Sequence, residues 1–323
     1  MANLNKIQQD AINDAMSQLI DAPAFTGVTD YPTGSGSSYS FQGSNFGYYS
    51  GGGPTLTNTI DKFPFATDTN ATDVGDLTIA RARVSGQSSS DNGYSSGGIT
   101  PTPTNTIDKF PFATDANATD VGDMTVARNN LTGSSSEANG YVAGGTPDGG
   151  IIEKFPFATD ANATDVGDLT VARYGLAGQS SSENGYCSGG VPAPTNGNII
   201  EKYPFASDAN ATDVGDLSRN TFYATGQSSS THGYTSGGNA PGFTNVIDKY
   251  TFASDADATD VGDLTNLKDQ VVGQSSTDNG YTSGGRIPSI SNIIDKFPFA
   301  SDANATDVGD LTVARTWGAG QQY

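Results

Sequence analysis

The chain has 323 residues, of which 41 are glycine and 34 % are hydrophobic. This composition is lean for a helical enzyme and suits a repetitive β architecture with many turns. The 35 Asp and Glu residues outnumber the 15 Lys and Arg residues, which gives a formal net charge of −20. A surface with that charge repels phosphate backbones, so nucleic-acid binding is disfavoured and no nucleic-acid partner is expected.

Residues 1–22 are predicted to form a helical arm, because apolar side chains recur there at helical spacing before Pro23. Residues 23–40, rich in Gly and Ser, are predicted to be a flexible lead into the remainder of the chain. A lone helix has too little surface to bury, so we expect the arm to attach the protein to a partner or to further copies of itself. Docking on its own chain is the alternative. The apolar residues of this assembly arm are Leu4, Ile7, Ile12, Met16, Leu19 and Ile20.

The N terminus has no uninterrupted apolar core of the kind found in a signal peptide, and no run approaches the roughly 20 apolar residues of a membrane span. We therefore expect neither secretion through a signal peptide nor membrane insertion.

Cys187 is the one cysteine, so a disulfide within the chain is impossible. Other copies of its repeat have Ser95 or Val142 at this place, which indicates a small strand residue rather than a nucleophile.

Residues 41–323 consist of six repeats. The tetrapeptide Asp-Val-Gly-Asp recurs every 45 to 48 residues, and so does a Gly-Tyr pair followed two residues later by Gly-Gly. Period searches of this kind identify repeat architectures. The tetrapeptides begin at Asp73, Asp120, Asp165, Asp213, Asp260 and Asp307, and the tyrosines of the second marker are Tyr48, Tyr94, Tyr141, Tyr186, Tyr234 and Tyr281.

Each repeat contains four strand-length segments separated by turn-forming residues. In the third copy they are "RYGLAGQ" from Arg173, "GYCSGG" from Gly185, "IIEKFPF" from Ile151 and "TDVGDLTV" from Thr164. Four short strands per unit of this length are typical of a propeller blade, because one small sheet must bury both faces against its neighbours. The sequence therefore predicts an all-β fold, a six-bladed β-propeller of four-stranded blades over residues 41–323.

The strands at the two ends of the repeat region predict how the ring closes. The first-strand glycine recurs at Gly86 and in each later copy, and its sixth occurrence is Gly320 at the C terminus. The first Gly-Tyr strand, at Gly47, has no such strand before it. We expect the C-terminal strand to complete the blade begun by the N-terminal strands, which leaves no exposed sheet edge at the junction.

The order of Arg, "GY-x-x-GG", a strand ending in an aromatic residue and "DLTVAR" resembles the kelch repeat over residues 41–323. This resemblance implies a diglycine after the second strand and an Arg step into the next blade. Two departures are clear. The tryptophan typical of the kelch fourth strand is absent, with Thr164 or Val166 near its place, so blade packing must differ, and the Arg becomes Thr221 and Lys268 in two copies.

Two classes of propeller enzyme need residues that this chain lacks. A copper site like that of galactose oxidase requires two histidines. This chain has one, His232, which lies in a polar turn. The segment "SSDNGYS" from Ser89 partly matches the Asp-box of sialidases, but its closing tryptophan is missing and no arginine triad stands apart from the repeats. We therefore expect no catalytic residues and no cofactor.

The acidic turn Asp160–Asn162–Asp165 has oxygen ligands at crudely calcium-like spacing. It lacks the glycine and the terminal glutamate of an EF-hand loop, so we expect an Asx-turn that joins two strands, and no metal.

An Asp-Lys or Glu-Lys pair precedes each aromatic strand end, as in Asp108–Lys109, and places opposite charges on opposite strand faces. Its repetition in every blade predicts bridging between blades.

The loops after each diglycine vary in length and sequence while the adjacent strands barely change. Such loops lie together on one rim of a propeller and are the usual place for recognition. First-strand aromatic residues vary too: Tyr174, Phe222, Tyr223 and Trp317. Core filling is the favoured role for them, and the alternative is that they face the central channel or one rim. The candidate binding residues are Thr55, Leu56, Pro101, Pro103, Asp148, Pro192, Pro194, Phe243, Ile287 and Trp317.

The phrase "NxIDKFPFATDANATDVGDLTVAR" resembles a repeat in structural proteins of marine bacteriophages, especially cyanophages. This resemblance implies a non-enzymatic virion structural protein, such as a tail fibre or capsid decoration, made in the host cytoplasm and exposed on the virion surface in many copies. Its arm would bind other virion proteins, and its propeller would serve assembly or adhesion to a host surface glycan or protein. A propeller enzyme acting on polysaccharide and an intracellular kelch-type adaptor are the alternatives.

Overall fold

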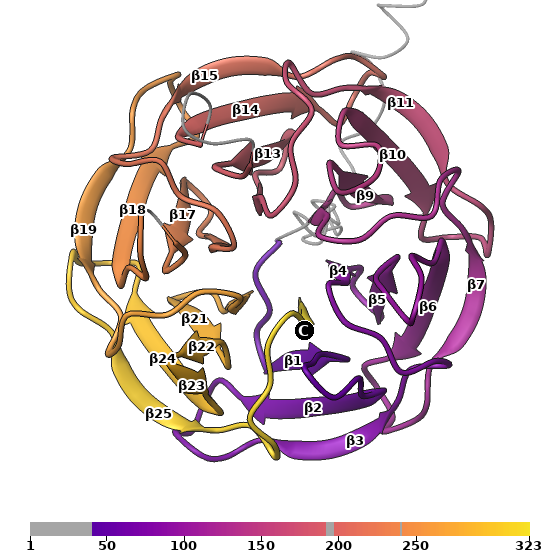
Figure 1. Cartoon of the computed structure of the whole chain (residues 1–323), viewed down its shortest axis with the longest axis horizontal. Helices are drawn as coiled ribbons and strands as arrows, with labels where there is room; N and C mark the ends of the chain where they lie inside the picture. Colours follow the sequence, from indigo (N-terminus) through magenta and orange to yellow (C-terminus); the bar gives the residue numbers. More distant parts are fainter. Residues whose placement is uncertain (1–40, 192–196, 240) are drawn as a thin grey trace, which may run out of the picture. The chain divides into compact units, whose positions relative to one another are not determined.

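Six four-stranded antiparallel sheets form a ring around a common axis (Figure 1). The computed structural model describes residues 41–191, 197–239 and 241–323, and the predicted arm (1–22) and lead (23–40) lie outside these residues. Each sheet is one blade, and its shortest strand contacts the corresponding strands of the two neighbouring blades. The described residues contain no helix. The predicted six-bladed β-propeller is therefore confirmed.

Each blade runs outward from the strand next to the axis. Blade 1 contains β26 (Ala319–Gln322), β1 (Phe46–Ser50), β2 (Thr59–Pro64) and β3 (Thr72–Asp76); blade 2 contains β4 (Ser85–Ser88), β5 (Asn92–Ser96), β6 (Thr106–Pro111) and β7 (Thr119–Asp123); blade 3 contains β8 (Thr132–Ser135), β9 (Asn139–Ala143), β10 (Ile151–Pro156) and β11 (Thr164–Asp168). Blade 4 contains β12 (Ala177–Ser180), β13 (Asn184–Ser188), β14 (Ile199–Pro204) and β15 (Thr212–Asp216); blade 5 contains β16 (Thr225–Ser228), β17 (His232–Ser236), β18 (Val246–Thr251) and β19 (Thr259–Asp263); blade 6 contains β20 (Val272–Ser275), β21 (Asn279–Ser283), β24 (Ile293–Pro298) and β25 (Thr306–Asp310), with a small hairpin of β22 (Arg286–Ile287) and β23 (Ser289–Ile290) after its second strand.

The innermost strands begin later than the sequence predicts. In blade 4, β12 starts at Ala177 and not at Arg173. The backbone of Gly175 has a φ of +67°, which no strand residue adopts, and the side chain of Arg173 is fully buried. The segment before each inner strand is therefore a tight turn that leads the chain from one blade into the next.

The C-terminal strand closes the ring, as predicted. β26 pairs antiparallel with β1, with Gly47 opposite Gln322 and Ser50 opposite Ala319. Blade 1 thus takes three strands from the start of the propeller and one from its end, and this pairing covers the edge that β1 would otherwise expose.

The inner strands approach one another at one glycine in each blade. A Cβ atom at Gly226 would lie 2.0 Å from the carbonyl oxygen of Gly178, and a Cβ atom at Gly178 would lie 2.2 Å from that of Gly133. The same relation continues around the ring through Gly86, Gly320 and Gly273. Because atoms cannot approach so closely, only glycine lets the six strands pack at this radius.

Aromatic side chains fill the interfaces between blades. Tyr94 of β5 stacks on Phe157 of the next blade, with ring centroids 4.8 Å apart, and its ring lies 5.4 Å from that of Phe155. Each of the six interfaces repeats this triad; the tyrosines are Tyr48, Tyr94, Tyr141, Tyr186, Tyr234 and Tyr281. Burial of these triads, together with the aliphatic residues beside them, holds neighbouring blades together.

Ion pairs at the surface join each blade to the next, which confirms the predicted bridging. Lys109 of β6 lies 2.5 Å from Asp160, which belongs to the turn between β10 and β11. The six pairs are Lys62–Asp115, Lys109–Asp160, Lys154–Asp208, Lys202–Asp255, Lys249–Asp302 and Lys296–Asp68. The last of them connects blade 6 to blade 1 and completes the circle.

The acidic turns are only partly the local Asx-turns that we expected. The Asp165 carboxylate does accept a hydrogen bond from the Gly167 amide, at 3.2 Å. Asn162, however, accepts one from the amide of Asp123 in the preceding blade, at 3.0 Å, and Asp160 pairs with Lys109 of that blade. These side chains turn away from their own loop because the neighbouring strand edge presents unpaired donors.

We expect Lys109→Met to lower the free energy of unfolding by only about 0.2–1 kcal/mol, because both partners are solvated and the pair is screened. Asp160→Asn should cost a similar amount, and the double variant should cost little more than either single one. Chemical denaturation in low and high salt measures this. A loss of unfolding free energy that persists in 1 M salt would show that the pair contributes by something other than the attraction between its charges.

A second set of ion pairs is buried. Arg128 enters from the connection between blades 2 and 3 and pairs with Glu153 of β10, and both side chains are fully buried. Its Nη1 also donates to the carbonyl oxygens of Gly144, at 2.5 Å, and Ile151, at 3.2 Å. Five blades have such a pair: Arg81–Asp108, Arg128–Glu153, Arg173–Glu201, Lys268–Asp295 and Arg315–Asp61.

In the described part of the chain, no helix is long and apolar enough to span a membrane.

Candidate functional site

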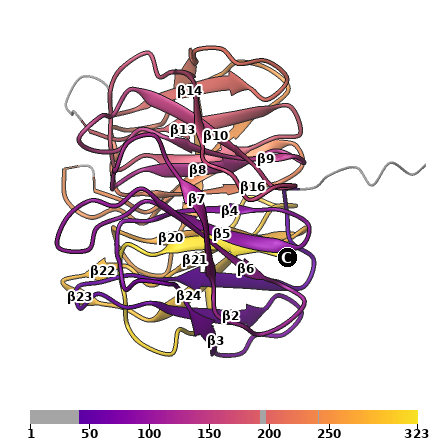
Figure 2. The same cartoon turned by 90° about the vertical axis from the view of Figure 1, so that its right-hand side faces the viewer.

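The central channel has two different ends. At one end the chain entering β1 crosses the axis: the Gly43 amide donates to the Ser275 carbonyl at 2.9 Å, and Gln322 Nε2 donates to the Phe41 carbonyl at 2.9 Å. Figure 2 shows this indigo segment and the C terminus on one side of the disc and the β22–β23 hairpin on the other. The end beside the hairpin, which we call the channel mouth, also has the loops that follow each diglycine.

A closed circle of backbone hydrogen bonds surrounds the channel mouth. One residue per blade, three positions before the inner-strand glycine, donates its amide to the carbonyl of its counterpart in the preceding blade, at distances of 2.6 to 3.1 Å. All six have a positive φ, between +55° and +67°. In ring order these mouth residues are Arg83, Asn130, Gly175, Tyr223, Gln270 and Trp317.

Five of the six mouth residues adopt this conformation without being glycine. The left-handed region costs an ordinary residue roughly 1–2 kcal/mol, and glycine would occupy it without that cost. Strained backbone of this kind clusters at functional sites. The outer three strands and the diglycine repeat almost unchanged in each blade, whereas the mouth residues, like the residues just before them, are six different amino acids. This variation on a repeated scaffold favours a role in recognition.

The side chains at the mouth form one aromatic and polar surface. The Arg83 guanidinium lies over the Trp317 ring, 4.5 Å from its centroid. The Tyr223 ring occupies the space that a Cβ atom at Gly175 would need, and burial raises the pKa of its hydroxyl, which therefore remains a donor at neutral pH. Asn130 and Gln270 contribute largely buried amides. The indole Nε1 of Trp317 is a buried donor with no partner among the described residues.

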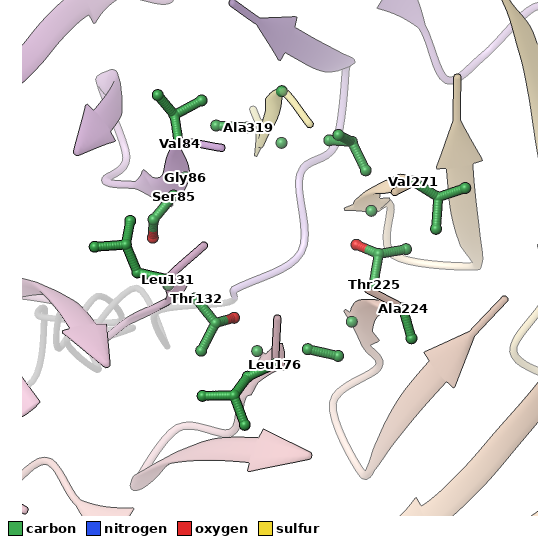
Figure 3. Close-up of a pocket in the computed structure, with 18 of the residues that line it drawn as sticks. Val84, Ser85, Gly86, Leu131, Thr132, Leu176, Ala224, Thr225, Val271 and Ala319 are labelled. Atoms are coloured by element: carbon green, nitrogen blue, oxygen red, sulfur yellow. The ribbon is translucent and has the colours of Figure 1, made fainter. Parts of the chain in front are cut away.

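Below the mouth the channel wall is mostly backbone. Figure 3 shows Val84, Leu131, Leu176 and Val271 pointing away from the axis, towards the interfaces between blades. The space between atoms along the channel is about 790 Å³, part of it open to solvent. The variable side chains of the mouth are therefore the groups that a ligand entering from this end meets first.

The predicted loop residues lie on the rim beside this mouth, where the structure describes them. Thr55, Leu56, Pro101, Pro103 and Asp148 are exposed in the loops after the diglycines. Pro192 and Pro194 lie outside the described residues, and Ile287 lies in β22.

Two of the predicted residues make contacts between blades. Phe243 lies under the Arg286 guanidinium, 5.2 Å from it, and Arg286 in turn pairs with Asp269 at 2.9 Å. Trp317 lines the channel, which was the alternative to the favoured role in core filling. Tyr223 does so too, with Phe222 and Tyr174 half-buried beside it at 5.3 and 6.4 Å between ring centroids.

Sequence reasoning missed Arg83, Asn130 and Gln270. A partial signal was present: aligned on the inner-strand glycine, this position differs in all six copies, but so does the position before it. A positive φ at a residue other than glycine cannot be recognised in a sequence.

Other reactive side chains lie apart from the mouth. Among the described residues no three of the types His, Cys, Asp and Glu cluster as metal ligands. Burial raises the pKa of the Cys187 thiol, and desolvation with the nearby Lys249 charge lowers the pKa of His232. The mouth has the groups for non-covalent recognition: aromatic faces, amides and one guanidinium.

The chain matches no known family profile, and no curated protein matches it significantly.

We expect Gln270→Gly to change the free energy of unfolding by less than about 1 kcal/mol, because glycine removes the strain of a φ of +58° but adds chain entropy to the unfolded state. Gln274→Gly is the matched control. Gln274 donates to the Tyr48 carbonyl of blade 1 and accepts from Ser283 of its own blade, and the loss of its side chain should cost about 2–4 kcal/mol. Equal losses in urea denaturation would contradict the strain argument.

Proposed function

We propose that this protein is a non-enzymatic virion structural protein that displays its propeller for recognition, with the channel mouth as the binding surface. The observation that carries the recognition role is the ring of six different mouth residues on a repeated scaffold, five of them held in a conformation that favours glycine. A protein that needed only the ring for stability would lose little by having glycine at these places. The assignment to a virion rests on the resemblance of the repeat to phage structural proteins.

The ligand that fits the mouth best is a neutral glycan on a host surface. Sugar rings stack their C–H faces on aromatic side chains, which Trp317 and Tyr223 provide, and their hydroxyls pair with amides such as those of Asn130 and Gln270. The net charge of −20 acts against polyanionic ligands at long range. A wall of fixed backbone presents these groups without the entropy cost of ordering a loop.

The alternatives receive less support from the mouth. A glycoside hydrolase needs a pair of free carboxyl groups facing the substrate. Asp269, which precedes Gln270 in the chain, is fully buried and accepts hydrogen bonds from Arg286 on both carboxylate oxygens. A protein-binding adaptor would use the same rim, and the binding experiment below distinguishes a glycan from a protein ligand.

Binding of the full-length protein to an array of neutral and acidic host-surface glycans tests the recognition role. We expect Trp317→Ala to weaken binding at least ten-fold. Ile79→Ala, at an exposed apolar residue of the β3–β4 connection, serves as the control and should bind normally. No glycan binding, or equal binding by Trp317→Ala, would refute the channel mouth as a glycan site.

Mass spectrometry of purified phage particles from the source of the gene tests the virion role. We expect the chain at a stoichiometric copy number, and its absence from particles would favour an intracellular adaptor.

Size-exclusion chromatography of the chain with and without residues 1–40 tests the arm. Assembly through the arm predicts a smaller species after deletion, and an unchanged oligomer would refute assembly through the arm.

A further inference from the structure

Blade 5 lacks the buried cation that the other blades have. Where they place Arg or Lys, blade 5 has Thr221, yet it keeps the carboxylate, Asp248 of β18, which is 2 % exposed. Asp248 Oδ2 accepts a hydrogen bond from the Ser218 amide at 3.2 Å. Its Oδ1 and the hydroxyl of Thr221 are both buried, and neither has a partner among the described residues.

A crevice remains where the guanidinium would lie. Its walls include Thr221, Gly237, Val246 and Asp248. Gly237 and Val246 pair with each other as Gly189 and Ile199 do in blade 4. There Arg173 donates its Nη1 to the carbonyls of Gly189, at 2.5 Å, and Ile199, at 3.3 Å. The crevice in blade 5 is thus lined by the residues that hold a cation elsewhere, and only the cation is missing from the chain.

Arg219 does not replace the missing group. Its guanidinium also borders the crevice, but it donates to Thr244 Oγ1 at 3.3 Å and lies 3.5 Å from the Asp260 carboxylate, with its side chain 38 % exposed. Arg219 and Asp260 have opposite charges, so their effects on Asp248 oppose each other. Desolvation has a larger effect than either charge and raises the pKa of Asp248. This is what burial does to a carboxyl group that has no counter-ion beside it.

We propose that this crevice binds a small monovalent cation, Na⁺, in place of the guanidinium of the other blades. Its ligands would be the Asp248 carboxylate, the Thr221 hydroxyl and the carbonyl oxygens of Gly237 and Val246, the hard oxygen donors that such an ion requires. The crevice is too narrow for a water molecule unless its walls move. Bare Na⁺ is smaller than water, whereas K⁺ is about as large, so the site should select Na⁺. This inference is independent of the proposed recognition role.

Thermal unfolding of the full-length protein tests the site. Choline chloride, whose cation cannot enter the crevice, is replaced stepwise by NaCl or KCl at constant ionic strength. We expect a saturable rise in Tm with Na⁺ of about 2–4 °C at ten times its dissociation constant, and a smaller rise with K⁺. A saturable ²³Na NMR line broadening that the protein causes is the direct readout.

Two variants decide the assignment. Thr221→Arg installs the side chain that four other blades pair with an Asp or Glu carboxylate, and it should raise Tm in choline and abolish the response to Na⁺. Asp248→Asn keeps the shape, removes the charge and should also abolish the response. As a matched gain-of-site variant, Arg81→Thr recreates the Thr and Asp combination in blade 2 opposite Asp108, and should add a second Na⁺-dependent increment.

Identical Tm values in Na⁺, K⁺ and choline would overturn the proposal, and so would a Na⁺ response that survives in Thr221→Arg. If Asp248 is instead simply protonated, Tm should fall as the pH rises above about 4, the ordinary carboxyl pKa, because the folded state then holds a proton that the unfolded state releases. In that case the fall would be the same in all three salts.

Discussion

Gly226→Ala should lower the free energy of unfolding by at least about 3 kcal/mol and should prevent accumulation of folded protein at 37 °C. The added Cβ atom would lie 2.0 Å from the carbonyl oxygen of Gly178 and 2.9 Å from the Gln179 amide. The Gly178 carbonyl is backbone in a paired strand and cannot turn aside, so the inner strands would have to move apart and loosen all six blades. Urea denaturation and yield of soluble protein measure the effect.

Gly150→Ala is the control for this substitution. Its Cβ atom would meet nothing closer than the Asp168 carboxylate at 3.8 Å, and its φ is not positive, so we expect no loss and a gain of up to about 1 kcal/mol from the stiffer unfolded chain. If Gly226→Ala were as stable as Gly150→Ala, the ring would be able to widen, and the close packing at the axis would not limit the number of blades.

Arg128→Met should lower the free energy of unfolding by about 3–5 kcal/mol, because it leaves the charge of Glu153 buried without a counter-ion. Glu153 keeps its hydrogen bond from the Thr125 amide in this variant but has no cation beside it. The lost stability is therefore mainly the cost of burying an unpaired carboxylate. This is several times the expected loss at Lys109, although both substitutions remove one cation from one ion pair.

The double variant Arg128→Met with Glu153→Leu tests that explanation. Two apolar side chains of similar volume carry no buried charge, so most of the lost stability should return. A double variant as unstable as Arg128→Met alone would mean that the contacts of Arg128 with the carbonyls of Gly144 and Ile151 provide the stability, and that the ion pair itself contributes little.

The fold could be predicted because a repeat states the same information six times. The glycine of the first strand, the Gly-Tyr pair and the Asp-Val-Gly-Asp turn occur in register, and their number equals the number of blades. The closure by β26 followed from one unpaired copy at each end of the chain. Bridging by Lys109 and its equivalents followed from charge pairs that recur in every blade.

The buried ion pairs could not be predicted, because a sequence does not show which way a side chain turns. Arg128 follows an exposed loop and would ordinarily be solvated, yet the tight turn at Asn130 directs it into the blade. The mouth residues were hidden for a related reason. Asparagine, glutamine and arginine are common in surface turns, and only the backbone hydrogen bonds from one blade to the next show that they lie side by side.

The circle of main-chain hydrogen bonds at the mouth also bears on how such a protein changes over generations. These bonds fix the positions of the six mouth residues without using their side chains. A single codon change can therefore exchange one mouth side chain while the contacts that join the blades stay as they are. Sites on one unchanged ring, coupled only where their side chains touch, as Tyr223 does Gly175 and Arg83 does Trp317, let a lineage alter its specificity in single steps. The same property makes the ring a suitable starting point for a designed library of binders.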